Sequence, residues 1–394
     1  MFRDDKTNNV PGEPSVKIRS IEIIRLSIPF STGTTERKHS GPVQDDDAFN
    51  AASPRHRRME SLMVKVSTDT GRVGWGEAFG HGANPVTFKA FTDLVAPLFI
   101  GTALDQREHS LEAARRALHG FGSTGPLAYA LSGIDIALWD LAAQAAGQPL
   151  HRFLNGTARP LELYASLVSY GNDPDEVYRQ VSRARAQGFR KIKLHETRVE
   201  AIAAARRALP VAAGELMVDV NCPWTVEQAK AQAEQLRSLE LTWLEEPVWP
   251  PDDAHGLAAV RRVGVPLSAG ENAAGVNGLR ALFEQQAVDI AQPSVAKIGG
   301  ITAMLEVFAL ARQYDVKVVP HCFYYGPGLL AVAHLCTLLP EDVAVEVPFI
   351  EFEALLYPAL AFTPRMQLPE VPGLGFAPDP QVLEDYLVDR ALIV

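Results

Sequence analysis

Three carboxylates recur at equal intervals in the middle of the chain. Each ends a short apolar stretch: Asp219 in LMVDVN, Glu245 in LTWLEEP and Glu271 in PLSAGEN, at separations of 26 residues. One more interval of 26 residues toward the N-terminus reaches Lys193, in KIKLHE. A strand, a returning helix and two short loops need about that many residues. The spacing therefore predicts four polar groups at equivalent ends of four successive strands.

The three carboxylates predict a metal site. Acids that converge from adjacent strands repel one another unless a cation lies between them. A set of oxygen ligands that leaves room for water and substrate suits Mg²⁺, for which Mn²⁺ can substitute. We expect Asp219, Glu245 and Glu271 to bind this ion.

Two lysines precede this series. Lys191 and Lys193 alternate along one predicted strand, so they point to the same face, which we place in the interior of the fold at its open end. Two ammonium groups close together near a metal lower the pKa of one of them, which makes that lysine usable as a base. We predict Lys193 as the base, because it is nearer the strand end, and Lys191 as its electrostatic partner.

After Leu150 the pattern alternates between strand-like and helix-like segments, such as VEQAKAQAEQLRSLE and ITAMLEVFALARQY. Eight strands with intervening helices predict a (β/α) barrel. Barrel active sites lie at the rim formed by the C-terminal ends of the strands. The polar residues predicted at that rim are Ser166, Lys193, Asp219, Glu245, Glu271, Ser294, His321 and Glu346.

The remaining rim residues suggest further roles. His321 ends the seventh strand and is expected to act as an acid or a base. Glu346 ends the eighth and, if protonated, donates a hydrogen bond to a developing oxyanion. Substrate contacts are expected from Ser166, His195, Asn221 and Ser294. The set describes abstraction of a proton next to a carboxylate, through an enediolate.

The first part of the chain has a different pattern. Residues 16–30 and the hairpin SLMVKVSTDTGRVGWGEA predict strands, and Pro85 to Leu150 predicts helices. Between them, residues 31–58 are either a solvated loop or a lid over the site. Asp135 and Asp140 lie within a helical pattern and are expected to be buried caps or interdomain hydrogen-bond partners. The C-terminal stretch is expected to return as loop and helix onto this region.

Composition narrows the function class. The 394 residues carry a formal net charge of −10, which disfavours nucleic-acid and anionic-membrane partners. Three scattered cysteines fit a reducing compartment, and no apolar run reaches bilayer length. We expect a cytoplasmic, homo-oligomeric protein with a small-molecule carboxylate as its substrate.

The ordered set of motifs resembles the enolase superfamily, and more closely its mandelate racemase/muconate lactonizing enzyme family. The motifs are VGWGE, ALSGIDIALWD, the lysine pair, the ligand series, AKIGG, His321, Glu346 and PGLG. The resemblance implies a modified (β/α)₇β TIM-type barrel, residues 151–361, under an α+β capping domain. It places the cap in residues 16–150 with 362–394. Before the cap, residues 1–15 have charges and prolines but no apolar core, which predicts a flexible leader. The resemblance also implies Mg²⁺ as the cofactor and specificity set by cap loops, here residues 31–58 and 77–86.

One position departs from the family pattern. Where racemase-like members have an aspartate that pairs with the histidine, this chain has Ser294, and Lys297 in the same motif is not predicted to be a base. His321 is then less firmly held as one tautomer. This favours one base and one acid, and so dehydration of an acid sugar or ring-opening cycloisomerisation of a sugar-acid lactone. The alternatives are a racemase or epimerase of a 2-hydroxy or amino acid, and a barrel that binds metal or ligand without turnover.

Overall fold

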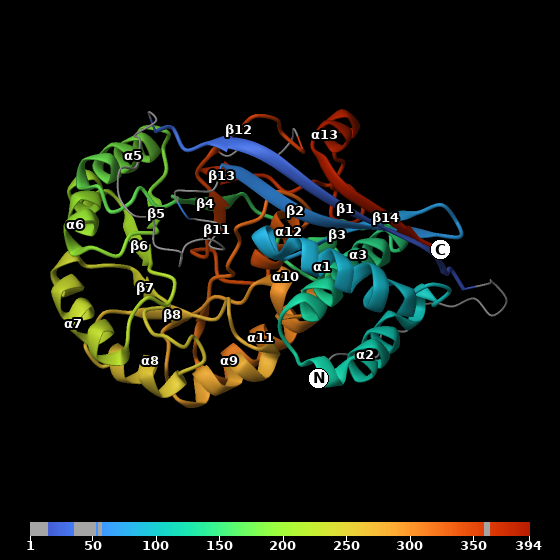
Figure 1. Ribbon diagram of the computed structural model, residues 1–394, viewed down its shortest axis with the longest axis horizontal. Helices are drawn as coiled ribbons and strands as arrows, with labels where there is room; N and C mark the ends of the chain where they lie inside the picture. Colours follow the sequence, from blue (N-terminus) through green and yellow to red (C-terminus); the bar gives the residue numbers. More distant parts are fainter. Residues whose placement is uncertain (1–14, 35–52, 54–56, 358–362) are drawn as a thin grey trace.

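The computed structural model describes residues 15–34, 53, 57–357 and 363–394. Two sheets organise this part of the chain: a curled parallel sheet with helices outside it, and an antiparallel sheet flanked by helices (Figure 1). The buried apolar side chains form two hydrophobic clusters. One is centred on the parallel sheet and includes some residues of β1 and β2, and the other lies within the cap. The predicted fold, a barrel domain with an α+β cap, is confirmed, while the exact domain boundaries stay a prediction.

The parallel sheet contains all eight predicted strands. Hydrogen-bonded strands follow one another across this sheet in the order β10-β9-β8-β7-β6-β5-β4-β11. From β4 to β10, strands that are consecutive in the chain are therefore neighbours in the sheet. The last strand of the chain in this sheet, β11, pairs with the first, β4. Short β13 (Arg365–Met366) adds to β4 in antiparallel orientation. The eight strands are β4 (Leu161–Ser166), β5 (Lys191–Leu194), β6 (Glu215–Asp219), β7 (Trp243–Glu245), β8 (Leu267–Ala269), β9 (Ile290–Ala291), β10 (Lys317–Val318) and β11 (Val345–Pro348).

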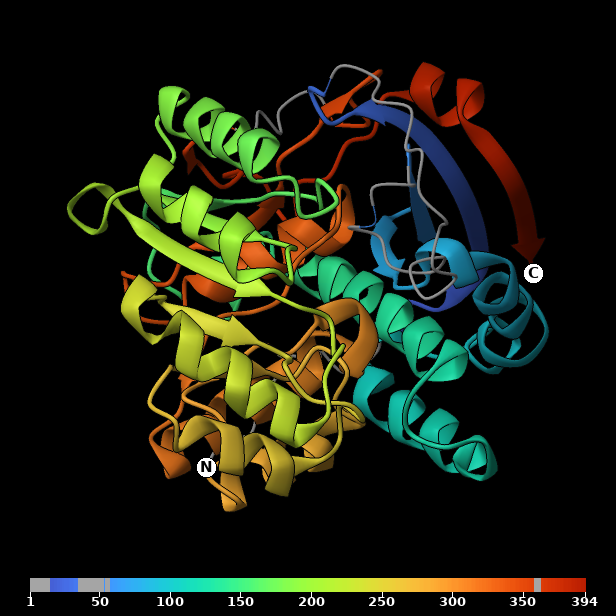
Figure 2. The ribbon, with the colours of Figure 1, turned by 60° about the vertical axis from the view of Figure 1, so that its left-hand side comes forward.

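Helices follow these strands and cover the outside of the sheet, as Figures 1 and 2 show for α5 to α9. Local sequence starts them: Asp173 caps α5 before a proline, and Thr225 with Gln228 forms a capping box on α7. The helices of this domain are α5 (Pro174–Ala186), α6 (Val199–Ala208), α7 (Val226–Leu236), α8 (Ala254–Arg261), α9 (Gly275–Glu284), α10 (Val295–Ile298), α11 (Gly300–Tyr314) and α12 (Pro327–Cys336).

The register of the parallel strands sets the height of each inward side chain. Asp219 is paired with Glu245, so these two carboxylates are level with each other. In the register of β5 and β6, His195 follows its strand at the level of Asp219. Because inward side chains recur every two residues, Lys193 lies one layer below Asp219 and Lys191 two layers below it.

The antiparallel sheet of the cap has the strand order β12-β1-β2-β3, and β14 pairs with β1. The predicted strand and hairpin are thus present, but the returning C-terminal stretch adds a strand as well as a helix. The strands are β1 (Ile18–Ser31), β2 (Arg58–Thr68), β3 (Val73–Ala78), β12 (Glu351–Phe352) and β14 (Leu387–Ile393). The helices are α1 (Asn84–Ala90), α2 (Arg107–Ala117), α3 (Pro126–Ala145), α4 (Leu150–Phe153) and α13 (Pro380–Asp385).

Two buried aspartates of α3 hold the cap together and connect it to the barrel. Asp135 in α3 accepts hydrogen bonds from the backbone N–H (2.9 Å) and hydroxyl (2.5 Å) of Thr302 in α11. Asp140 accepts from the N–H groups of Trp75 and Leu374, at 2.8 Å each. The prediction that these aspartates are buried hydrogen-bond partners is confirmed. Asp135 thus joins the cap to α11 of the barrel, and Asp140 joins β3 to the C-terminal segment within the cap.

Glu77 makes a similar connection from β3 and predicts a pH-dependent stability. Burial raises its pKa from 4.5 to about 7, even though it accepts a hydrogen bond from the Gly328 N–H at 2.9 Å. Because the pKa of Glu77 is raised in the folded state, its protonated form stabilises the fold below pH 4.5, and this stabilisation is lost as the pH rises through 7. The free energy of unfolding should fall by about 3 kcal/mol over this range. We expect Glu77→Gln to remove this loss, as measured by urea unfolding at pH 5 and pH 8.

The exposed carboxylate Asp105 provides the control, because Asp105→Asn leaves no buried group altered. It should follow the wild-type pH dependence. Parallel curves for wild type and Glu77→Gln would contradict the prediction.

Some predictions fall outside the described residues. The leader and most of the lid of residues 31–58 belong to the parts of the chain that the structure does not describe. Within the described ranges, no helix is long and apolar enough to cross a membrane.

Candidate active site

The three predicted metal ligands converge at one end of the parallel sheet. Asp219 and Glu245 are the last residues of β6 and β7, and Glu271 follows β8 after one further residue. Lys193 lies beneath the first two, with its Nζ 3.5 Å from Asp219 Oδ2 and 3.2 Å from Glu245 Oε2. Glu271 is paired instead with His321, whose Nε2 is 2.6 Å from Glu271 Oε2.

These carboxylates interact electrostatically. Burial, together with the charge of Asp219, raises the pKa of Glu245 well above its usual range. Burial also acts to raise the pKa of Glu271, but His321 and Lys297 outweigh it and lower that pKa well below its usual range. Glu271 makes ionisation of Asp219 and of Glu245 less favourable, and Asp219 makes ionisation of Glu245 less favourable. A cation placed between the three would relieve this repulsion.

The donor chemistry fits Mg²⁺. All three side chains are oxygen donors and lie at most 12% exposed, which is the kind of ligand set that a hard divalent cation prefers. Within the described residues, no three acid, histidine or cysteine side chains already form a metal cluster. The three carboxylates are instead paired with Lys193, Lys297 and His321. Metal binding would therefore exchange some of these ion pairs for metal contacts.

Lys193 does not have the environment predicted for a base. It is fully buried, and its Nζ is also 2.8 Å from Glu346 Oε1. Burial alone would lower its pKa, but the charges of Glu245 and Glu346 raise that pKa well above the usual value. The prediction of a lowered pKa at Lys193 is wrong, because the neighbouring groups are carboxylates and the expected second ammonium is absent from this layer.

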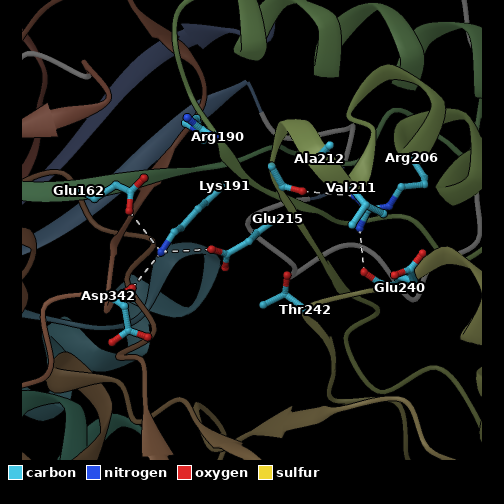
Figure 3. Close-up of a pocket in the computed structure, with 11 residues that line it drawn as sticks. Glu162, Arg190, Lys191, Arg206, Val211, Ala212, Glu215, Glu240, Thr242 and Asp342 are labelled. Carbon is cyan, nitrogen blue, oxygen red and sulfur yellow. Dashed lines mark hydrogen bonds and ion pairs between the residues drawn. The ribbon is translucent and has the colours of Figure 1, made fainter.

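That second ammonium, Lys191, lies at the opposite end of the barrel. Figure 3 shows it pointing to a pocket at the N-terminal ends of the strands. Its Nζ is 3.2 Å from Glu162, 3.5 Å from Glu215 and 2.8 Å from the carbonyl oxygen of Asp342. Lys191 is thus not an electrostatic partner of Lys193; it joins β4, β5, β6 and the segment before β11. The two-residue period predicted the shared face correctly, but the register puts Lys191 at the bottom.

This placement predicts a structural role for Lys191. We expect Lys191→Met to lower the free energy of unfolding by about 1–3 kcal/mol, because Glu162 and Glu215 lose their shared cation. Mg²⁺ affinity and turnover should stay near wild type. Calorimetric titration and chemical unfolding measure the two effects separately. A large loss of Mg²⁺ affinity without loss of stability would return Lys191 to the active site.

The surroundings of Glu346 also differ from those predicted. It pairs with Lys193 and accepts a hydrogen bond from the Cys322 N–H at 2.8 Å. Burial acts to raise its pKa, but Lys193 lowers it below the usual value. The carboxyl is therefore ionised, and the predicted hydrogen-bond donation from a protonated Glu346 is not available in this arrangement.

The four residues predicted to contact substrate have different surroundings. His195 Nε2 lies 3.4 Å from Asp219 Oδ2, and the Asn221 side chain donates to Asp219 Oδ1 at 2.9 Å. Ser294 has its hydroxyl in contact with that of Tyr324. The buried Ser166 hydroxyl has no hydrogen-bond partner among the described residues. All four stay predictions as substrate contacts; Ser166 is the one whose hydroxyl is uncommitted.

Several residues near the ligands were not predicted. Lys297 Nζ lies 3.5 Å from Glu271 and 2.9 Å from the side-chain oxygen of Asn272, whose Nδ2 donates to Glu246 at 2.7 Å. Glu246 and Asn272 each directly follow a ligand in the sequence, and this adjacency was the available signal. Gln292, at the end of β9, is buried with neither side-chain polar atom hydrogen bonded within the described part.

The cap reaches this site through aromatic side chains. Phe79, after β3, places its ring 4.2 Å from Lys297 Nζ and packs edge-on against Tyr324. Tyr324 also packs edge-on against His321. Aromatic side chains of the cap and the barrel thus lie beside the third candidate ligand, Glu271.

Comparison with known proteins agrees with this geometry. Residues 176–382 match the family model "Enolase C-terminal domain-like". Residues 46–155 match "Mandelate racemase / muconate lactonizing enzyme, N-terminal domain".

Characterised relatives cover almost the whole chain. The D-galactarolactone cycloisomerase of Agrobacterium fabrum is 29% identical over 90% of this chain and 98% of its own. The D-xylonate dehydratase of Haloferax volcanii is 27% identical over 83% and 85%. Among solved structures, the 3,6-anhydro-D-galactonate cycloisomerase of Zobellia galactanivorans superposes with a TM-score of 0.78 at 26% identity, covering 95% of this chain and 100% of that one.

A Paracoccus denitrificans protein of the same family, solved in complex with magnesium, gives a TM-score of 0.79 at 25% identity, covering 95% of this chain and 99% of that one. The matched models together span most of the chain, and the strand-end carboxylates lie within the first of them. The chain therefore belongs to the mandelate racemase/muconate lactonizing enzyme family of the enolase superfamily.

Proposed function

We propose that this protein is a Mg²⁺-dependent enzyme that removes the proton α to a carboxylate. The overall reaction is the dehydration of an acid sugar or the ring-opening cycloisomerisation of a sugar-acid lactone. The observation that carries this proposal is the set of three buried carboxylates, Asp219, Glu245 and Glu271, at the ends of adjacent parallel strands. The names of the relatives support the substrate class, since they include acid-sugar dehydratases and lactone cycloisomerases.

The residues of the site can divide the work as follows. Mg²⁺, when bound by the three carboxylates, would act as a Lewis acid that lowers the energy of the enolate charge. Lys193 and Glu346 form a buried ion pair that holds the floor of the site. His321 stands beside the third ligand, where it can protonate a departing β-oxygen or the enolate. The uncommitted polar groups of Ser166 and Gln292 offer hydrogen bonds to substrate hydroxyls.

The direct test is a screen of mono- and diacid sugars and their lactones in deuterated water with Mg²⁺. NMR of the products identifies the reaction. A 2-keto-3-deoxy acid indicates dehydration, and opening of the lactone with deuterium at one carbon indicates cycloisomerisation. If no acid in the screen loses its α-proton while Mg²⁺ still binds, the protein is a binding barrel and the proposal fails.

A racemase or epimerase is the second candidate, and one observation favours it. His195 contacts the first ligand of the series and His321 the third, so two imidazoles lie at its two ends. Two acid–base groups can serve both faces of a substrate carbon. Appearance of solvent deuterium in both epimers, with no loss of water, would select this reaction.

A further inference from the structure

His195 is held in one orientation by the backbone. Its Nδ1 lies 2.5 Å from the carbonyl oxygen of Leu167, in the loop after β4. A carbonyl oxygen accepts and never donates, so Nδ1 carries the proton of this hydrogen bond. In the neutral ring the lone pair is then on Nε2. This nitrogen faces the candidate metal site, 3.4 Å from Asp219 Oδ2.

His195 also lies at the same height in the barrel as the candidate metal ligands. It continues β5 at the level of Asp219, which is itself paired with Glu245. Lys193 lies one layer lower, fully buried among carboxylates. Its Nζ is surrounded by the carboxylates of Asp219, Glu245 and Glu346. His195 Nε2, in contrast, lies at the level of the candidate ligands Asp219 and Glu245, on a ring whose other nitrogen is already hydrogen bonded.

The surroundings of His195 keep this geometry rigid. Its side chain is 7% exposed, and the ring of Phe323 packs edge-on against it. The next residue, Glu196, is buried and accepts hydrogen bonds from the N–H groups of Tyr170 and Asn172, at 2.5 and 2.6 Å. The loop that supplies the Leu167 carbonyl is thereby tied to the loop that carries His195. Such preorganisation is what an acid–base group in a site requires.

We propose that His195 Nε2 is the general base of this enzyme, in place of Lys193; this assignment rests on the function proposed above. The α C–H bond breaks, the proton moves to Nε2, and the electron pair enters the enolate of the substrate carboxylate. The imidazolium so formed lies next to Asp219, which stabilises its charge. The electron pair then forms the α,β double bond and expels the β-oxygen. In dehydration this oxygen leaves as water with a proton from His321, and in the cycloisomerisation it leaves as the carboxylate of the opened lactone, after which His321 can protonate the enol product.

The variant His195→Asn tests the base role with little structural change. The asparagine amide can keep the donation to the Leu167 carbonyl, but it has no basic nitrogen in place of Nε2. We expect α-proton exchange in deuterated water to fall by about 10²–10⁴-fold, with Mg²⁺ affinity near wild type. In His195→Ala, added imidazole should restore part of the exchange. A matched control is His119→Asn, since exposed His119 makes the same kind of contact, Nδ1 to the Arg116 carbonyl at 2.7 Å.

Other outcomes would overturn the proposal in distinct ways. Exchange within tenfold of wild type in His195→Asn would exclude the base role, and loss of Mg²⁺ affinity would make His195 a metal ligand instead. ¹⁵N NMR of histidine-labelled protein, assigned with the same variant, should show the proton of neutral His195 on Nδ1. A proton on Nε2 would overturn the proposal whatever the substrate. Absence of exchange in wild type, by contrast, would refute the proposed function itself.

Discussion

Glu245→Gln is expected to abolish Mg²⁺-dependent turnover, with a loss of at least about 10³-fold, and to weaken Mg²⁺ binding by at least about 10²-fold. Glu245 is the middle one of the three candidate ligands and is fully buried. A neutral amide leaves two carboxylates, which hold a hard dication less strongly and stabilise less charge. Calorimetric titration with Mg²⁺ and the deuterium-exchange assay measure the two losses.

The stability of Glu245→Gln should change little in the absence of Mg²⁺. The amide keeps the size of the side chain, and Lys193 keeps its other two carboxylate partners, Asp219 and Glu346. Glu162→Gln is the matched control, since Glu162 is a carboxylate of the same barrel paired with Lys191 at the opposite end. That variant should keep Mg²⁺ binding. Equal Mg²⁺ affinity in wild type and Glu245→Gln would refute the ligand assignment.

Lys193→Met is expected to cause the largest loss of stability, about 3–5 kcal/mol in the free energy of unfolding without Mg²⁺. The reason is that this ammonium neutralises three buried carboxylates, of Asp219, Glu245 and Glu346. Removing it leaves their charges unpaired in a low-dielectric interior. Saturating Mg²⁺ should recover part of the loss, because a cation between the ligands replaces part of the missing charge. Urea unfolding with and without Mg²⁺ measures both effects.

A double variant separates this electrostatic role from a catalytic one. In Lys193→Met/Glu346→Gln the closest partner, at 2.8 Å, is neutral as well, so the double variant should be more stable than Lys193→Met alone. If Lys193→Met were as stable as wild type and inactive only in proton exchange, Lys193 would be the base after all. The difference from His195→Asn is then diagnostic, since that variant should lose exchange and keep its stability.

Much of the fold follows from short-range pattern. Strand-like and helix-like segments alternate after residue 150, and all eight predicted strands are present in the parallel sheet. Short apolar runs bounded by turns suit strands that are covered on both faces. Asp219, Glu245 and Glu271, equally spaced in the sequence, lie at the same rim of the barrel, because each strand–helix unit brings the chain back to that rim. Asp135 and Asp140 were recognisable because an acid inside an apolar helix needs a buried partner.

The errors arose where the height of a side chain matters. Alternation along β5 shows that Lys191, Lys193 and His195 face one way, but not which of them is level with the ligands. That level depends on how β5 is staggered against β6, which is set by packing between strands distant in sequence. A shift of two residues moves a side chain by a full layer, about 7 Å. For this reason Lys191 lies at the bottom, Lys193 beneath the carboxylates and His195 beside Asp219.

Charge is the second property that only the folded chain decides. Read alone, two lysines two residues apart suggest ammonium groups that lower each other's pKa, and Glu346 suggests an acid that can be protonated. In the structure Lys193 is surrounded by carboxylates, which raise its pKa, and Glu346 is paired with the Lys193 ammonium, which lowers the pKa of Glu346. Both pKa shifts are opposite to those expected from the sequence. Partners separated by up to 153 residues in the chain, such as Lys193 and Glu346, set these pKa values. The sequence by itself determined the barrel, its rim and the three candidate ligands; tertiary packing decided which nitrogen faces them, because only register and long-range contacts fix the position of a charge.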